Sequence, residues 1–148
     1  MEKSPFEQFE ELRIDAAAKS FLGEAAKWTT FLSILGYIGI GFMVLASVAL
    51  FAVGSSLSMG PMRGGIWMGI FYLALAAFYF IPINLLYKFS SNMKAALRSN
   101  NQHSLVKAFE YLKSHYKFIG ILTIVLIGIY ILAIIGIVLT GMSGANYH

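Results

Sequence analysis

Long runs of apolar residues without a single charged side chain dominate this sequence. No Asp, Glu, Lys or Arg occurs in residues 28–62, 64–87 or 118–148. Each run exceeds the about 20 residues that an α-helix needs to cross a bilayer. Because backbone groups in hydrocarbon must find their hydrogen bonds within the segment, each run is predicted to cross a membrane as a helix.

The pattern predicts an all-α integral membrane protein with three transmembrane helices in a single membrane domain, residues 1–148. Its expected segments are a cytoplasmic N-terminal amphipathic helix at 1–27, transmembrane helices at 28–53, 66–87 and 118–140, an external loop at 54–65, a basic cytoplasmic helical hairpin at 88–117 and an external tail at 141–148. Composition agrees, since 58% of the residues are hydrophobic and 12% are charged, whereas soluble domains have about 25% charged residues.

The N-terminal segment carries two helix signals. Ser4, Pro5 and Glu7 are typical of a helix start, with a Ser cap and Pro at the first helical position. Further on, apolar residues recur in steps of three and four along one helical stripe that leads into the membrane: Ile14, Ala18, Phe21, Ala25, Trp28 and Leu32.

The second and third apolar helices are expected to extend beyond the bilayer as a hairpin. The helical pattern continues past Lys88, and Ser99, Asn100 and Asn101 supply the first turn, with Asn101 as a plausible cap. A helix over 102–140 would be about 58 Å long, of which the bilayer core takes about 30 Å. Pro82 should kink the second helix, because it removes one backbone hydrogen bond.

Basic residues fix the expected orientation. Of the eleven Lys and Arg residues, four precede Trp28 and six lie in 88–117, whereas the connection between the first two helices holds Arg63 alone. Basic residues are retained on the cytoplasmic side of short loops. The N-terminus and the hairpin are therefore expected in the cytoplasm and the C-terminus outside.

The hairpin is the candidate binding surface. Six bases against the single acid Glu110 give it a net charge of +5. The expected partner is the anionic lipid leaflet beside it, a protein surface is the alternative, and nucleic acid is not expected. The candidate residues are Lys88, Lys94, Arg98, Lys107, Lys113 and Lys117.

The segment before Trp28 has the opposite sign, since six acids and four bases give it a net charge of −2. One hypothesis is that this segment docks on the hairpin, with Phe6 and Phe9 near Leu105 and Phe109. The alternative is that both pieces lie on the lipid surface.

Small residues mark candidate packing faces, where helices can approach closely. They are Gly36, Gly39 and Ala46 in the first helix, Gly65, Gly69 and Ala76 in the second, and Ala133 and Gly136 in the third.

Residues that carry chemistry are scarce. The three predicted spans contain no ionisable acid or base, and such groups usually mark transport or catalytic sites in membranes. The three histidines have no partner at a metal-ligand spacing, and there is no cysteine. No catalytic, cofactor or metal site is predicted. Tyr130, near the middle of the third span, needs a hydrogen-bond partner.

The stretch from Ser90 to Tyr130 contains, in this order, Asn100, Asn101, Leu105, Ala108, Phe109, Leu112, Lys113, Tyr116, Lys117 and Gly120. With these residues it resembles a domain-of-unknown-function family of small bacterial membrane proteins, found notably among Bacteroidota. Phe21, Leu22, Trp28, Phe31, Leu32 and Gly36 are similar too. The resemblance implies a bacterial inner membrane and no particular activity.

Taken together, these features favour a non-enzymatic membrane protein that acts in assembly, as an accessory subunit of a larger complex or as a homo-oligomer. The alternative is a small transporter or channel protomer that builds a pathway only as an oligomer. Pore linings usually show polar or charged rings, and the predicted spans hold only scattered Ser, Thr, Tyr and Asn residues.

Overall fold

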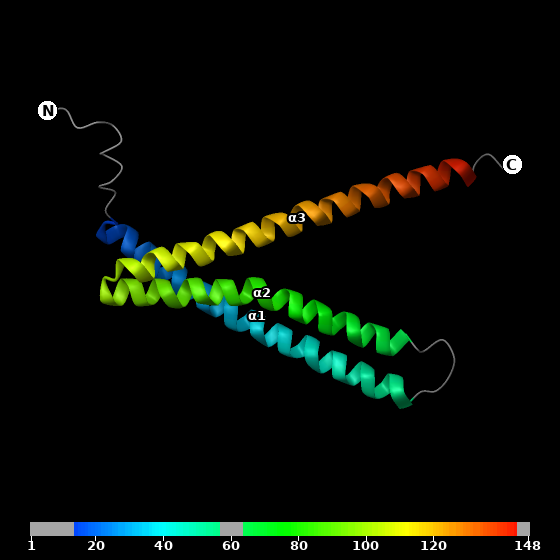
Figure 1. Ribbon diagram of the computed structural model, residues 1–148, viewed down its shortest axis with the longest axis horizontal. Helices are drawn as coiled ribbons and strands as arrows, with labels where there is room; N and C mark the ends of the chain where they lie inside the picture. Colours follow the sequence, from blue (N-terminus) through cyan, green and yellow to red (C-terminus); the bar gives the residue numbers. More distant parts are fainter. Residues whose placement is uncertain (1–13, 57–63, 145–148) are drawn as a thin grey trace.

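Three long helices make up the fold. The structure is a computed structural model that describes residues 14–56 and 64–144, with side chains at 14–53 and 65–140. Helix α1 covers Ala16–Ser56, α2 covers Gly64–Ser99 and α3 covers Gln102–Gly144 (Figure 1). At a rise of 1.5 Å per residue, helices of 41, 36 and 43 residues are about 54 to 65 Å long.

Each helix is long and apolar enough to cross a membrane, which confirms the predicted all-α fold with three candidate spans. The fold is consistent with a multi-pass membrane protein. Because the bilayer core is only about 30 Å thick, each helix is longer than a single crossing requires.

Local hydrogen bonds set the start of α1. The backbone N–H of Ala18 donates to the Asp15 carboxylate over 2.7 Å, and the N–H of Lys19 donates to the Asp15 carbonyl over 3.0 Å. Asp15 therefore caps the helix, because its side chain satisfies an N–H that the first turn leaves free. The helix start predicted at Ser4 and Pro5 lies outside the described residues.

The turn between α2 and α3 confirms the predicted one. Asn100 has a φ of 48°, in the left-handed region, and the N–H of Asn101 reaches back to the Ala96 carbonyl over 3.2 Å. This pattern ends α2 as a Schellman motif. The Asn101 side chain then caps α3 by accepting from the N–H of His103 at 2.9 Å and of Ser104 at 3.4 Å.

Small and hydroxyl-bearing side chains fill the interface between the antiparallel helices α1 and α2. Two hydrogen bonds join them: Thr30 and Ser90 lie 2.9 Å apart at their hydroxyl oxygens, and the Ser47 hydroxyl donates to the Gly69 carbonyl over 2.9 Å. Residues buried in this part of the fold include Ala26, Ser33, Ser47, Ala76 and Ser90. Such residues let two backbones come close and bond across the interface.

From Phe21 onward, the apolar stripe expected along the start of α1 faces away from α2. Phe21, Trp28 and Leu32 are 71%, 61% and 53% exposed, whereas Ala26 and Ser33, on the neighbouring face, are completely buried. Hydrophobicity does not choose the inner face of a helix in lipid, because lipid tails are as apolar as leucine. The large side chains can face lipid while the small ones make the helix contact.

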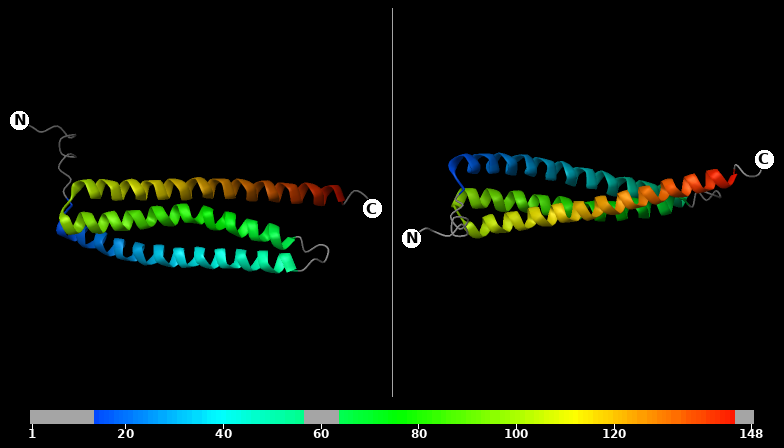
Figure 2. Two further views of the ribbon diagram at one scale, coloured as in Figure 1. Left: turned by 60° about the horizontal axis from the view of Figure 1, so that its bottom comes forward. Right: turned by 90° about the horizontal axis from the view of Figure 1, so that it is seen from above.

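One apolar core lies at the end of the molecule where α2 meets α3. It comprises Ala26, Phe89, Met93 and Ala108, contributed by all three helices. Half-buried apolar residues surround it: Leu22, Leu97, Leu105, Tyr111 and Leu112. Figure 2 shows that the start of α1 lies at the same end as the α2–α3 turn.

Helix α3 leaves the other two helices beyond this core. Its last half-buried residue is Leu122, and every residue from 123 to 140 is exposed. Figure 1 shows α3 diverging from α2 toward its C-terminal end, while α2 itself changes direction about midway. Pro82 lies inside α2, consistent with the predicted kink.

Gly36 and Gly39 provide a matched test of the α1–α2 interface. A Cβ added at Gly36 would lie 2.8 Å from Cδ1 of Ile83, whereas one added at Gly39 would meet nothing within 4 Å. Gly36→Leu should destabilise the folded protein by about 1 to 3 kcal/mol, the usual cost of overpacking. Gly39→Leu should stay within about 0.5 kcal/mol.

The measurement is unfolding of each purified variant by increasing SDS in mixed micelles, followed by circular dichroism. An equal loss for both variants would contradict the interface, because the two glycines differ only in what surrounds them.

Candidate functional site at the helical hairpin

The hairpin comprises the end of α2, the turn at Asn100 and Asn101, and the start of α3, over residues 88–117. Three contacts fasten α2 to α3 within the hairpin or next to it. The Lys88 ammonium lies 5.5 Å from the centre of the Tyr111 ring. Nδ1 of His115 donates to the Pro82 carbonyl over 2.9 Å. The rings of Phe78 and Phe118 lie 5.2 Å apart at their centroids.

Helix α1 also braces the hairpin. The Lys19 ammonium donates to the Asn100 side-chain oxygen over 3.2 Å, which ties the start of α1 to the turn. Thr30 bonds to Ser90 two to three turns further along α2. Together with the buried Met93, these contacts hold the hairpin in one position relative to the apolar spans.

The structure gathers all six predicted cations on this hairpin, where Lys94 is half-buried and the other five are exposed. No ion pair forms with any of the six within the described residues. Glu110, the one acid of the hairpin, is exposed as well. The charge of +5 is therefore not cancelled by the neighbouring helices.

The cations differ in their distance from the apolar spans. Lys88 and Lys117 adjoin the uncharged runs 64–87 and 118–148, whereas Arg98 and Lys107 each lie ten residues further along their helices, or about 15 Å. Lys113 is only about 6 Å along the axis from Lys117. Because the Debye length at physiological salt is about 8 Å, the outer pair would be largely screened from a membrane surface.

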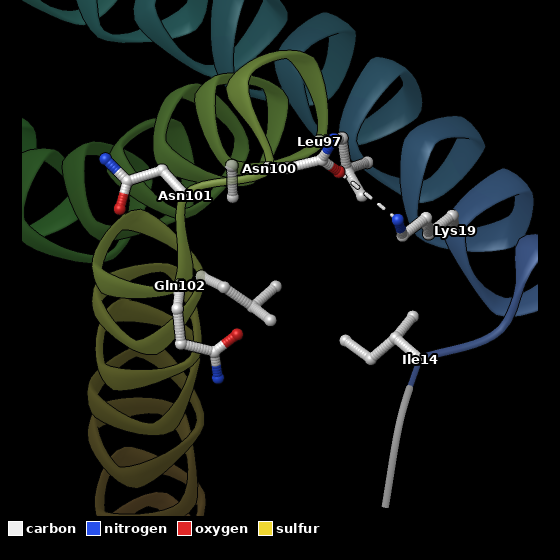
Figure 3. Close-up of a pocket in the computed structure, with 8 residues that line it drawn as sticks. Ile14, Lys19, Leu97, Asn100, Asn101 and Gln102 are labelled. Atoms are coloured by element: carbon white, nitrogen blue, oxygen red, sulfur yellow. Dashed lines mark hydrogen bonds between the residues drawn. The ribbon is translucent and has the colours of Figure 1, made fainter.

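A cavity of about 480 Å³ lies at the tip of the hairpin, where the start of α1 meets the α2–α3 turn (Figure 3). Its walls combine apolar side chains with one ammonium and three amides: Ile14, Lys19, Ala96, Leu97, Asn100, Asn101, Gln102 and Leu105. Sequence reasoning missed this cavity, because it forms between segments about eighty residues apart in the chain.

The cavity bears on the predicted docking of the N-terminal segment. Leu105, named as a docking residue, lines the cavity, and so does Ile14, which belongs to the segment before Trp28. Phe109 is exposed on α3. Phe6 and Phe9 lie outside the described residues, so the docking stays a prediction.

The predicted packing residues fall into two groups. Gly36, Gly69 and Ala76 lie between α1 and α2, where an added Cβ at Gly69 would come within 3.0 Å of the Phe51 ring. Ala46 and Gly65 are half-buried. Gly39, Ala133 and Gly136 are exposed, and a Cβ added at Gly39 or Gly136 would meet nothing within 4 Å in the described part of the chain.

Polar side chains within the first two spans bond to each other across the helix interface. The Tyr37 hydroxyl donates to the Asn84 side-chain oxygen over 3.4 Å, and Ser47 bonds to the Gly69 carbonyl. Within the described residues, no group of three or more His, Cys, Asp or Glu side chains could hold a metal ion. The exposed cations of the hairpin, which pair with no described acid, can bind anionic groups by charge and hydrogen bonds.

Three helices that are long and apolar enough to cross a membrane, with a basic hairpin between the second and third, are consistent with a multi-pass membrane protein. This chain belongs to a family of unknown function, DUF5362, whose model matches residues 62–138. The match contains the stretch from Ser90 to Tyr130 and confirms the expected resemblance to such a family; Phe21–Gly36 lies outside it. No curated protein and no solved structure matches the chain.

Proposed function

We propose that this protein is a non-enzymatic protein of the bacterial inner membrane that acts in assembly, as an accessory subunit of a larger complex or as a homo-oligomer. In this proposal the hairpin binds anionic lipid headgroups, and its tip receives a protein partner. The observation that carries the proposal is the basic hairpin itself, a braced structure at the end of the spans with six cations that no described acid pairs with.

The proposed orientation has the N-terminus and the hairpin in the cytoplasm and the C-terminus outside. Support comes from the contact between Lys19 and Asn100, which brings the start of α1 to the hairpin end of the molecule. The basic residues Lys19 and Lys27 of α1 therefore lie at the same end of the molecule as the six cations of the hairpin. Such a concentration of cations favours the cytoplasmic side.

Cations near the apolar spans and cations far from them suit different partners, and we call these two groups the inner and outer tiers. Lys88, Lys113 and Lys117 lie at the depth of lipid headgroups, where each exposed cation contributes about 1 kcal/mol to the attraction of an anionic surface. Arg98 and Lys107 lie beyond that range, toward the α2–α3 turn. They suit an acidic surface on a protein partner better than a lipid.

The alternative function, a small transporter or channel protomer, would need a polar path through the spans. The polar side chains Tyr37, Asn84 and Ser47 instead bond within the α1–α2 interface. The tip cavity lies at the hairpin end, and so does a second cavity, which Leu97 of α2 and α1 residues such as Lys27 and Trp28 line. No observation on the described residues favours this alternative over assembly.

The orientation is tested with a reporter enzyme that is active only outside the cytoplasm. Fused after His148 it should be active, and inserted at Asn100 it should be silent, because the proposed arrangement places an odd number of crossings between the two positions. Activity at Asn100 with silence at His148 would reverse the proposed orientation, and activity at both would remove the three-span topology.

Lipid binding is tested by two variants that each remove two cations. The double variant Lys113→Gln/Lys117→Gln should lower the preference for anionic over neutral lipid by about 2 kcal/mol, or about thirtyfold. The matched variant Arg98→Gln/Lys107→Gln should lower it by less than about threefold, because the outer pair is screened. Trp28, which is exposed near the hairpin, reports the preference through quenching by brominated anionic lipid in reconstituted bilayers.

A Trp67→Phe background leaves Trp28 as the single tryptophan for this measurement. The preference should also weaken as salt is raised. Equal effects of the two double variants would contradict the division into tiers, and no effect of either would remove lipid binding by the hairpin.

A further inference from the structure

The membrane half of α3 is an apolar surface that the rest of the described chain leaves uncovered. All residues from 123 to 140 are exposed, and Figure 1 shows this half diverging from the α1–α2 pair. Exposure alone suits a helix surrounded by lipid. Two further features of this half distinguish one of its faces.

The first feature is continuity with the interface inside the hairpin. Residues of α3 that meet α2 or the core recur in steps of three and four, and include Leu105, Ala108, Leu112, His115 and Phe118. Leu122, four residues further along, is the last half-buried residue of this face. Further steps of four and three along the same face give the α3 seam, which comprises Leu126, Ile129, Ala133, Gly136 and Thr140. Alternation of four and three keeps a single face turned toward a partner helix. The seam thus continues the face of α3 that packs against α2 in the hairpin, but no described helix covers it.

The second feature is the hydroxyl of Tyr130, which flanks the α3 seam beside Ile129. The side chain is 69% exposed, and its hydroxyl forms no hydrogen bond to any described residue. A hydroxyl in hydrocarbon without a partner is costly, so a second helix that offers an acceptor would be favoured. The other hydroxyls of this half, on Thr123 and Thr140, bond to carbonyls of α3 itself.

Helix α2 of the same chain is poorly placed to cover the seam. Its outer half is held to α1 by the bond from Ser47 to the Gly69 carbonyl. The ring of Phe51 also packs closely at Gly69. Closing α2 onto α3 would break these contacts, because α2 turns toward α1 and away from α3 in its outer half (Figure 1).

We propose that the α3 seam binds the α3 seam of a second copy of this chain, in a parallel pair about a twofold axis along the membrane normal. A twofold contact uses one surface twice, so a single unpaired face supplies both partners. Ala133 and Gly136 would lie where the two backbones approach most closely. Toward the hairpin the two helices would separate, which leaves room for each copy's own α2. This inference rests on the proposed assembly function and selects its homo-oligomeric form.

Single cysteines test the contact, because the chain has none of its own. Ala133→Cys and Gly136→Cys lie on the seam, and Ile131→Cys and Ile135→Cys lie at the same depth on the opposite face. In dilute proteoliposomes of the full chain under mild oxidation, the two seam variants should give disulfide-linked dimers about tenfold faster than the two controls, because only a fixed contact holds like positions together. Equal rates on both faces, or faster rates on the control face, would overturn the proposal.

Glycine variants give a second test that leaves the folded monomer unchanged. A Cβ added at Gly136 or at Gly128 meets nothing within 4 Å, and only Gly136 lies on the seam. Gly136→Ile should weaken dimerisation at least about tenfold, and Gly128→Ile should leave it unchanged, because a branched side chain separates backbones only where they meet. Tyr130→Phe should weaken it about threefold to tenfold, as expected for one interhelical hydrogen bond. Energy transfer between labelled copies, followed as lipid is added, measures the dissociation.

Failure of this inference can be told apart from failure of the proposed function. The preference of the hairpin for anionic lipid, measured at Trp28, should be the same in Gly136→Ile as in the unaltered chain. A monomeric protein that keeps this preference would overturn the seam contact alone. A dimer without the preference would overturn lipid binding and leave the seam contact standing.

Discussion

Lipid tails are as apolar as leucine, so helices in a bilayer gain little by burying large apolar side chains against each other, and close approach and hydrogen bonds must hold them together. The α1–α2 pair meets this requirement. Gly36 and Gly69 admit the side chains of Ile83 and Phe51, and hydroxyl bonds join Thr30 to Ser90 and Ser47 to Gly69. The outer half of α3 makes no such contact with the other described helices, and it diverges from them.

In the proposed arrangement the hairpin end lies outside the bilayer, because α2 and α3 are longer than one crossing needs. There the hydrophobic effect can act, and Met93, Phe89 and Ala108 form a buried core with Ala26 of α1. This core and the bond from Lys19 to Asn100 fix the positions of the six hairpin cations relative to the spans. The proposed function follows from these contacts. They hold the basic surface of the hairpin at a fixed distance from the spans, and they leave the outer half of α3 available for assembly.

Features set by local chemistry could be predicted from the sequence. The turn at Asn100 and Asn101 needs only a residue that accepts a positive φ and a side chain that caps the next helix, and the three spans need only uninterrupted apolar length. The inner face of α1 could not be predicted by hydrophobicity, since Phe21, Trp28 and Leu32 face outward and Ala26 and Ser33 face α2. Nor could the tip cavity or the divergence of α3, because both depend on contacts between segments far apart in the chain.

The central claim is that α1 and α2 form one packed unit in the membrane while the outer half of α3 stands apart from it. Spin labels on the exposed positions Val53, Ile66 and Ile131 test this claim directly, as two cysteine pairs that share Ile66. Labelled protein is diluted with an excess of unlabelled protein in bilayers, so that distances within one chain are measured. The Val53–Ile66 pair should give a short and narrow distance distribution, and the Ile66–Ile131 pair a clearly longer mean distance. An Ile66–Ile131 distance as short as that of Val53–Ile66 would contradict the account, because α3 would then pack on α2 along its whole length.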